Sequence, residues 1–139
     1  MYSISKKIKI GKKALLQKDK FINEEAIPVA ITRFVCCECG HENTVEISPY
    51  QSGFPIFQIY HDNKVLSKSE LLNNQMINET SQRMQHYGEL TVTDLPTLYF
   101  GTQCTACQAR YFCVFGYGEW QPGLEILKIS GIWEYQELE

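Results

Sequence analysis

The most informative segment of the chain is Cys36-Cys37-Glu38-Cys39-Gly40, and it has a counterpart in Cys104-Thr105-Ala106-Cys107-Gln108. Two cysteines separated by two residues grip one metal ion from a tight turn, because the backbone between them folds back and directs both sulfurs to one point. Two such turns supply four thiolates, the tetrahedral ligand set of a closed structural zinc site. The sequence therefore predicts a bound Zn²⁺ ion with four ligands: Cys36, Cys39, Cys104 and Cys107.

Strand-like segments flank both cysteine turns. Residues 29–35 lead into the first turn and residues 44–47 lead out of it, and β-branched and aromatic side chains are frequent in both. Residues 97–103 and 110–117 flank the second turn in the same way. Gly40 follows Cys39 directly, where a metal-binding turn needs a residue that tolerates a positive φ. We therefore expect each turn at the tip of a β-hairpin.

This arrangement resembles the zinc-ribbon and rubredoxin-like group of folds. The resemblance covers about half of the chain, residues 29–47 and 97–118, and it implies the same four cysteine ligands. The Cys-Pro-x-Cys-Gly turns of rubredoxins are absent, which favours zinc over iron. Two features depart from the group. Gln108 stands where the second turn usually has glycine, which predicts a differently shaped or strained turn, and residues 40–103 form a long separation between the pairs.

The expected fold is a single α+β domain over residues 1–139, because 139 residues that are 44% hydrophobic can bury a real core. Its parts are a zinc-ribbon-like antiparallel β-sheet from halves at about 29–47 and 97–135, an insertion at about 48–96, and a basic N-terminal arm at 1–20. The insertion is expected to contain one helix over about 68–86. Ser67 and Glu70 give that helix a capping-box signature.

Charge is unevenly distributed along the chain. The first 20 residues contain seven lysines and one aspartate, and the remainder contains six basic and fifteen acidic residues, which gives a net charge of −3. We expect the lysines to solvate a short strand that ends at Gly11 and one or two helical turns within residues 12–20. The basic arm leaves nucleic-acid binding open, because such binding rests on neutralising phosphates, whereas the acidic body repels them.

Aromatic residues are concentrated near the C-terminus. They are Tyr111, Phe112, Phe115, Tyr117, Trp120, Trp133 and Tyr135. Strand alternation places Tyr111 and Phe115 on one face and Phe112 on the other. One face is expected to cover the core, and the other would stack on bases or contact a protein. The acidic residues nearby favour packing or protein contact.

The chain carries no catalytic signature. Four thiolates fill the coordination sphere of zinc, whereas a catalytic zinc needs an open position. A zinc deaminase would need His-x-Glu and Pro-Cys-x-x-Cys, but His41 is followed directly by Glu42, and Gln103 precedes Cys104. Cys37 is expected to be a spare thiol and Cys113 a small core residue. We therefore expect a protein without enzymatic activity.

Location and partners follow from the same features. No run of 18 apolar residues and no signal-peptide core is present, so we expect a cytoplasmic protein whose paired cysteines hold metal rather than form disulfides. The leading hypothesis is a protein-binding module, in its narrower form a bacterial immunity protein or antitoxin that neutralises a basic toxin or enzyme. The alternative is a nucleic-acid-binding zinc ribbon. The oligomeric state stays open.

The insertion has two readings. Glu70 and Glu79 lie on polar positions of the predicted helix and are the candidate partner-binding residues. In the other reading, the helix only covers an open face of the sheet through Leu72, Met76 and Met84.

Overall fold

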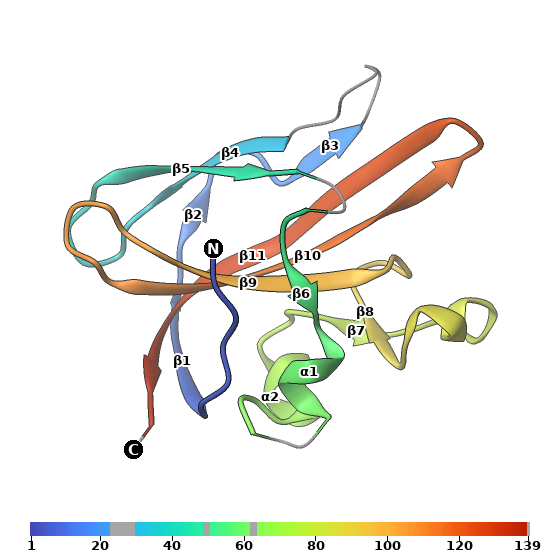
Figure 1. Cartoon of the computed structure of the whole chain (residues 1–139), viewed down its shortest axis with the longest axis horizontal. Coiled ribbons are helices and arrows are strands. Elements are labelled where there is room, and N and C mark those ends of the chain that lie inside the picture. Colours follow the sequence, from blue (N-terminus) through green and yellow to red (C-terminus); the bar gives the residue numbers. More distant parts are fainter. Residues whose placement is uncertain (23–29, 49–50, 62–63, 139) are drawn as a thin grey trace.

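The computed structural model describes residues 1–22, 30–48, 51–61 and 64–138. Its elements stack in three layers, with a six-stranded antiparallel sheet in the middle, a three-stranded sheet on one side and short helices on the other (Figure 1). The fold is thus mainly antiparallel β-sheet with a few short helices, which agrees with the coarse α+β expectation. Within the described ranges, no helix has the length and hydropathy to cross a membrane.

The central sheet is built around a long hairpin. Strands β10 (Arg110–Gln121) and β11 (Leu124–Glu137) are joined by a tight turn in which Gly123 adopts φ +80°. The sheet order is β1-β11-β10-β9-β6, and β3 also pairs with β11. The other strands are β1 (Ile8–Lys13), β3 (Lys20–Ile22), β6 (Phe54–Pro55) and β9 (Thr97–Gln103).

The second sheet contains strands β2 (Leu15–Leu16), β4 (Ala30–Val35) and β5 (Glu42–Ile47), in the order β2-β4-β5. Alternate residues of β4 and β5 are buried, which is the pattern of a sheet with one face on the core and one in water. The hairpin that was predicted around the first cysteine turn is confirmed. Residue 29, its expected start, lies outside the described residues.

The single helix predicted over 68–86 is wrong. Helix α2 (Lys68–Asn73) begins at the predicted cap, with the Glu70 N–H donating to Ser67 Oγ at 3.1 Å. It ends at Asn73 because Gln75 adopts φ +57°, and this reversal of the chain buries Met76 and Ile77 in the core. The other helices and strands that the structure describes in the insertion are also short. Besides β6, they are α1 (Phe57–Tyr60), β7 (Asn78–Glu79), the 3₁₀ helix η1 (Gln82–Tyr87) and β8 (Leu90–Thr91).

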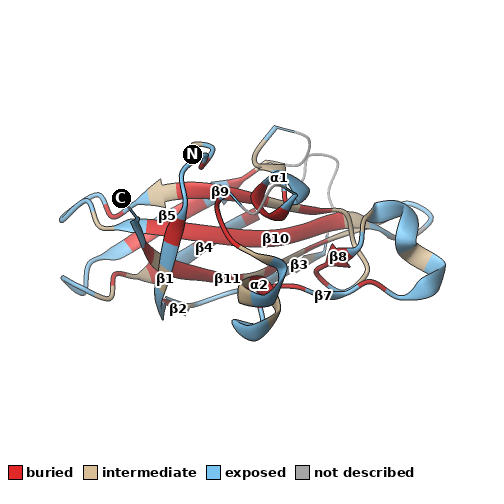
Figure 2. Cartoon of the chain, turned by 90° about the horizontal axis from the view of Figure 1, so that it is seen from below, coloured by how far each residue is buried: buried red, intermediate tan, exposed pale blue. Residues whose placement is uncertain are grey.

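Both faces of the central sheet are buried (Figure 2). On one face Tyr111, Cys113 and Phe115 pack beneath the second sheet. On the other face Phe112 and Val114 pack against the insertion, which contributes Ile56, Ile59, Tyr60, Val65, Leu66, Leu71, Met76, Ile77, Leu90 and Val92. Of the alternatives left open for the second face, packing is therefore the one that holds for these residues. The side chain of Trp120 lies outside the described residues.

The lysine-rich N-terminal segment belongs to the sheets. Strand β1 continues past Gly11 and pairs with β11, and β3 pairs with β11 again, so the helical turns expected within residues 12–20 are wrong. The segment is also held at its start, because the Tyr2 backbone pairs with Gly101. All seven lysines are exposed along this segment. Lysine suits an edge strand, since its charge opposes pairing with another chain.

Candidate metal centre

Two hairpins from different sheets place the cysteine turns side by side. In the turn between β4 and β5, Cys36 N–H donates to the His41 carbonyl at 2.9 Å, and Gly40 N–H donates to the Cys36 carbonyl at 3.0 Å. The turn between β9 and β10 repeats this pattern at 2.9 Å for both bonds, with Cys104, Ala109 and Gln108 in the matching positions. The two turns therefore have the same shape, and their tips lie at one end of the molecule (Figure 1).

The four predicted cysteines come together at these tips. Their sulfurs all lie within 4.8 Å of one another. Cys36 Sγ is 3.5 Å from Cys107 Sγ, and Cys39 Sγ is 3.6 Å from Cys104 Sγ. A tetrahedral zinc site with Zn–S bonds of about 2.3 Å has sulfur–sulfur edges of about 3.8 Å, whereas a disulfide needs about 2.05 Å. The cluster therefore fits one metal ion with thiolate ligands.

Burial differs within each turn. Cys36 and Cys104 are buried, and Cys39 and Cys107 are exposed. An ion held by all four would sit at the rim of the molecule, with its coordination completed by protein sulfur. Such a site is closed, so it leaves no position for a substrate or an activated water.

Hydrogen bonds favour the thiolate form of the two buried cysteines. Burial raises the pKa of the Cys104 thiol, but backbone N–H groups of Cys107 and Ala106 and the Asn43 side chain lower it to about 6. Burial also raises the pKa of Cys36, but hydrogen bonds from the Tyr111 hydroxyl and from the backbone N–H groups of Cys39 and Glu38 outweigh burial, so the net shift of this pKa is downward. A metal binds the deprotonated thiolate, so these contacts prepare the site.

Two buried polar residues that the sequence analysis missed complete the centre. Asn43 is 4% exposed, and Tyr111 is fully buried. Asn43 Oδ1 accepts the Thr105 N–H at 2.9 Å, and the Tyr111 hydroxyl accepts the Cys37 N–H at 2.7 Å. The sequence feature that could have indicated them is their matching position, since each residue comes four places after the last cysteine of its own turn.

The other predicted residues lie away from the cysteine cluster. Glu70 accepts a hydrogen bond from Ser67 Oγ at 3.1 Å, so its carboxylate is engaged at the start of α2. Glu79 is exposed on β7. Cys37 is half-buried and Cys113 fully buried, and desolvation raises the pKa of both thiols. Neither thiol belongs to the cluster.

A hollow of ≈ 410 Å³ adjoins the first cysteine turn. It is lined by residues that include Glu38, Glu134 and Glu137, and Arg110 pairs with Glu137 at 2.9 Å. Burial raises the pKa of Glu134, and the neighbouring Glu38 carboxylate raises it further. Glu134 Oε2 is buried and accepts no hydrogen bond from the described residues. The hollow is therefore acidic.

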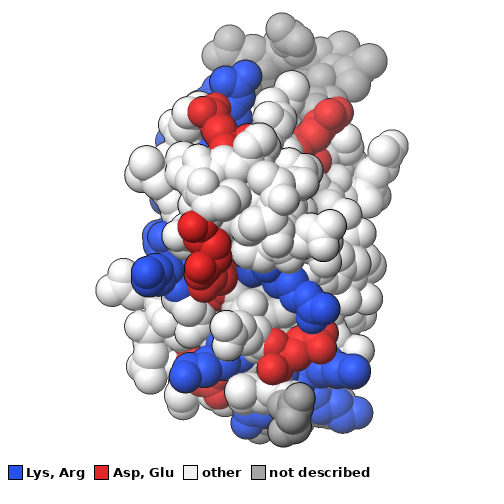
Figure 3. Space-filling view, turned by 90° about the vertical axis from the view of Figure 1, so that its left-hand side faces the viewer, with Lys and Arg blue, Asp and Glu red and all other residues white. Residues whose placement is uncertain are grey.

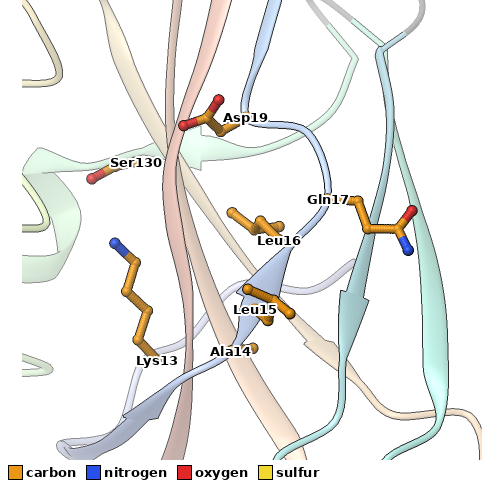
Figure 4. Close-up of a pocket in the computed structure, with 7 residues that line it drawn as sticks. All are labelled: Lys13, Ala14, Leu15, Leu16, Gln17, Asp19 and Ser130. Atoms are coloured by element: carbon orange, nitrogen blue, oxygen red, sulfur yellow. The ribbon is translucent and has the colours of Figure 1, made fainter.

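A second pocket, of ≈ 480 Å³, opens where the chain passes from β1 to β2. Lys13 and Asp19 lie at its ends with Leu15 and Leu16 between them (Figure 4). The Ser130 hydroxyl at its wall donates to the Met76 carbonyl at 2.6 Å, so it is not poised as a nucleophile. The lining residues supply no nucleophile–base pair, and the pocket defines no reaction.

Gln108 carries the strain that its position predicts. It adopts φ +65°, close to the φ +75° of Gly40 in the first turn. A side chain in this left-handed region costs about 1–2 kcal/mol, partly offset by the extra freedom that glycine has in the unfolded chain. We expect Gln108→Gly to raise the free energy of unfolding of the metal-loaded protein by about 0.5–1 kcal/mol, measured by urea unfolding.

Gly40→Ala is the matched control. An added Cβ at Gly40 meets no atom within 4 Å, so the only change is the strained φ. This variant should lose about 1 kcal/mol. Equal stabilities for the wild type and both variants would contradict the strain at Gln108.

Comparison with protein-family models, with curated proteins and with solved structures finds no match to this chain. The class of protein therefore rests on the geometry alone. It is a mainly antiparallel β protein with a four-cysteine cluster that can hold a metal ion.

Proposed function

We propose that the four cysteines bind one Zn²⁺ ion with a structural role, and that the protein is a non-enzymatic cytoplasmic module that binds another protein. The observation that carries the proposal is that two hairpins from different sheets bring four sulfurs to tetrahedral spacing. An ion there would join the two sheets and would be fully coordinated by thiolates. Elemental analysis of the purified protein tests the metal: one zinc per chain is expected, and one iron per chain would overturn the assignment.

Charge supports a basic partner. Outside the first 20 residues the chain carries fifteen acidic and six basic groups. The hollow beside the first cysteine turn adds a specific feature, because Glu38, Glu134 and Glu137 line it and their carboxylates would attract a lysine or arginine of the partner. An immunity protein or antitoxin that blocks a basic toxin is the narrower form of the proposal, with electrostatic attraction giving fast association.

Charge variants locate the partner surface once a partner is captured from among the proteins encoded beside this one. Glu79→Lys tests the insertion without disturbing a cap, whereas Glu70 is unsuitable because it holds Ser67. Glu134→Gln tests the hollow. We expect Glu134→Gln to weaken binding at least tenfold, about 1.4 kcal/mol, measured by calorimetry.

The two variants also serve as controls for each other. If Glu79→Lys changes the affinity by less than threefold, about 0.6 kcal/mol, the insertion only covers the sheet. If neither variant weakens binding, the acidic surfaces do not recognise the partner. Recovery of no partner at micromolar concentration would remove the support for a protein-binding role.

A nucleic-acid-binding role is the second candidate, and the exposed lysines of residues 6–20 favour it. Figure 3 argues against a continuous basic surface at the end where the cysteine turns lie, since acidic and basic groups alternate there. The test is a salt titration of DNA binding with Lys9, Lys12 and Lys13 replaced by glutamine. Deleting residues 1–20 is unsuitable, because β1 is part of the central sheet. No binding at low salt would exclude this role.

A further inference from the structure

We propose that Asn43 and Tyr111 are positioning residues that lock the two cysteine turns against each other crosswise and thereby set the metal affinity. The inference rests on the proposed function, in which the four cysteines bind zinc.

The two residues occupy matching positions. Each is the buried polar residue four places after the second cysteine of its turn, on the strand that leaves that turn. Asn43 belongs to β5, and Tyr111 belongs to β10. Because the turns have the same backbone hydrogen bonds, the two side chains start from equivalent places.

Tyr111 reaches from the second hairpin to the first turn. Its hydroxyl accepts the Cys37 N–H at 2.7 Å and donates to Cys36 Sγ at 3.2 Å. Its ring packs on Phe34 of β4, with ring centroids 4.8 Å apart. The side chain is fully buried, so its direction is fixed by packing. It holds both the backbone after the first ligand and the ligand sulfur.

Asn43 reaches in the opposite direction, from the first hairpin to the second turn. Its Oδ1 accepts the Thr105 N–H at 2.9 Å and the Thr105 hydroxyl at 3.2 Å. Its Nδ2 donates to the carbonyl of His41 in its own turn at 3.2 Å. Asn43 thus connects the backbones of both turns.

The crosswise pattern is what gives these contacts a role in metal binding. Each residue accepts the N–H that follows the first cysteine of the opposite turn: Cys37 after Cys36, and Thr105 after Cys104. A rotation of either turn would break a buried hydrogen bond, so the four sulfurs stay near the spacing that the ion requires. Partners of metal ligands typically change metal affinity by about 10–100-fold when they are removed.

The test compares Tyr111→Phe with Tyr99→Phe. Tyr99 is an equally buried tyrosine whose hydroxyl accepts the Ile4 N–H at 3.1 Å, in the cluster on the other face of the central sheet. Both variants keep the ring and lose one buried hydroxyl. We expect Tyr111→Phe to weaken zinc binding about tenfold in competition with a chromophoric chelator and to shift the charge-transfer bands of the cobalt-substituted protein. Tyr99→Phe should leave both unchanged.

Amide hydrogen exchange gives a readout that needs no metal. In the metal-free protein, Tyr111→Phe should speed exchange of the Cys37 amide but not of the Thr105 amide, and Asn43→Ala should do the reverse. Equal zinc affinities for the two tyrosine variants, or unchanged exchange at both amides, would overturn the proposal. If the wild type takes up no zinc, the proposed function fails, and the exchange data still decide whether the crosswise lock exists.

Discussion

Replacing Cys104 by serine should lower the midpoint of thermal unfolding of the zinc-loaded protein by about 15 °C. Cys104 is one of the two buried cysteines of the cluster, and its loss would leave a bound ion with only three thiolate ligands. Metal that binds only the folded state at a thousand times its Kd contributes about 4 kcal/mol to the free energy of unfolding. Calorimetry with a defined free zinc concentration measures the shift.

Cys37→Ala is the control for this prediction, because it removes a thiol from the neighbouring turn that is outside the cluster. It should retain one zinc per chain and shift the midpoint by only a few degrees, about 1 kcal/mol or less. A chelator should bring the wild type close to Cys104→Ser. If the chelator leaves the wild-type midpoint unmoved, the ion is not structural.

The second large effect on stability is expected from substitutions in strand β10. Phe112→Ala and Phe115→Ala should each lower the free energy of unfolding by about 3–5 kcal/mol. The reason is that Phe112 is 0% and Phe115 is 1% exposed, in clusters on opposite faces of the same strand. Urea unfolding measures both, and they test whether the central sheet is covered on both sides.

Phe57→Ala provides the comparison, because Phe57 is 49% exposed on α1. It should change the free energy of unfolding by about 0.5 kcal/mol or less. A base-stacking surface on β10 would behave differently. Its substitutions would leave stability nearly unchanged and lower affinity for single-stranded nucleic acid.

Features carried by neighbouring residues could be predicted from the sequence. The spacing of Cys36 and Cys39 fixes a turn, and the alternation on either side of it fixes a hairpin, as the structure confirms. The cap of α2 could also be predicted, since Ser67 and Glu70 are only three residues apart. The end of that helix could not be predicted, because the reversal at Gln75 brings Met76 and Ile77 into a core built from distant strands.

The features that could not be predicted depend on contacts between residues far apart in the sequence. Alternation in β10 defines two faces, but whether both are covered depends on the insertion and on the second sheet. The lysines of residues 6–20 suggested a solvated helical turn, yet β1 pairs with β11 at the other end of the chain. Tyr111 and Cys37 are likewise 74 residues apart in sequence, so their contact has no local signature.

The position of the cysteine turns at one end of both sheets divides the molecule into a restrained end and a yielding end (Figure 1). An ion held there would limit how far β4–β5 can separate from β9–β10, whereas at the opposite end the two layers are held by side-chain packing. Transient separation of the layers should therefore start where β4 begins and β5 ends. With an ion bound, the end that carries the cysteine turns would stay rigid, while the far end could change its shape on contact with a partner.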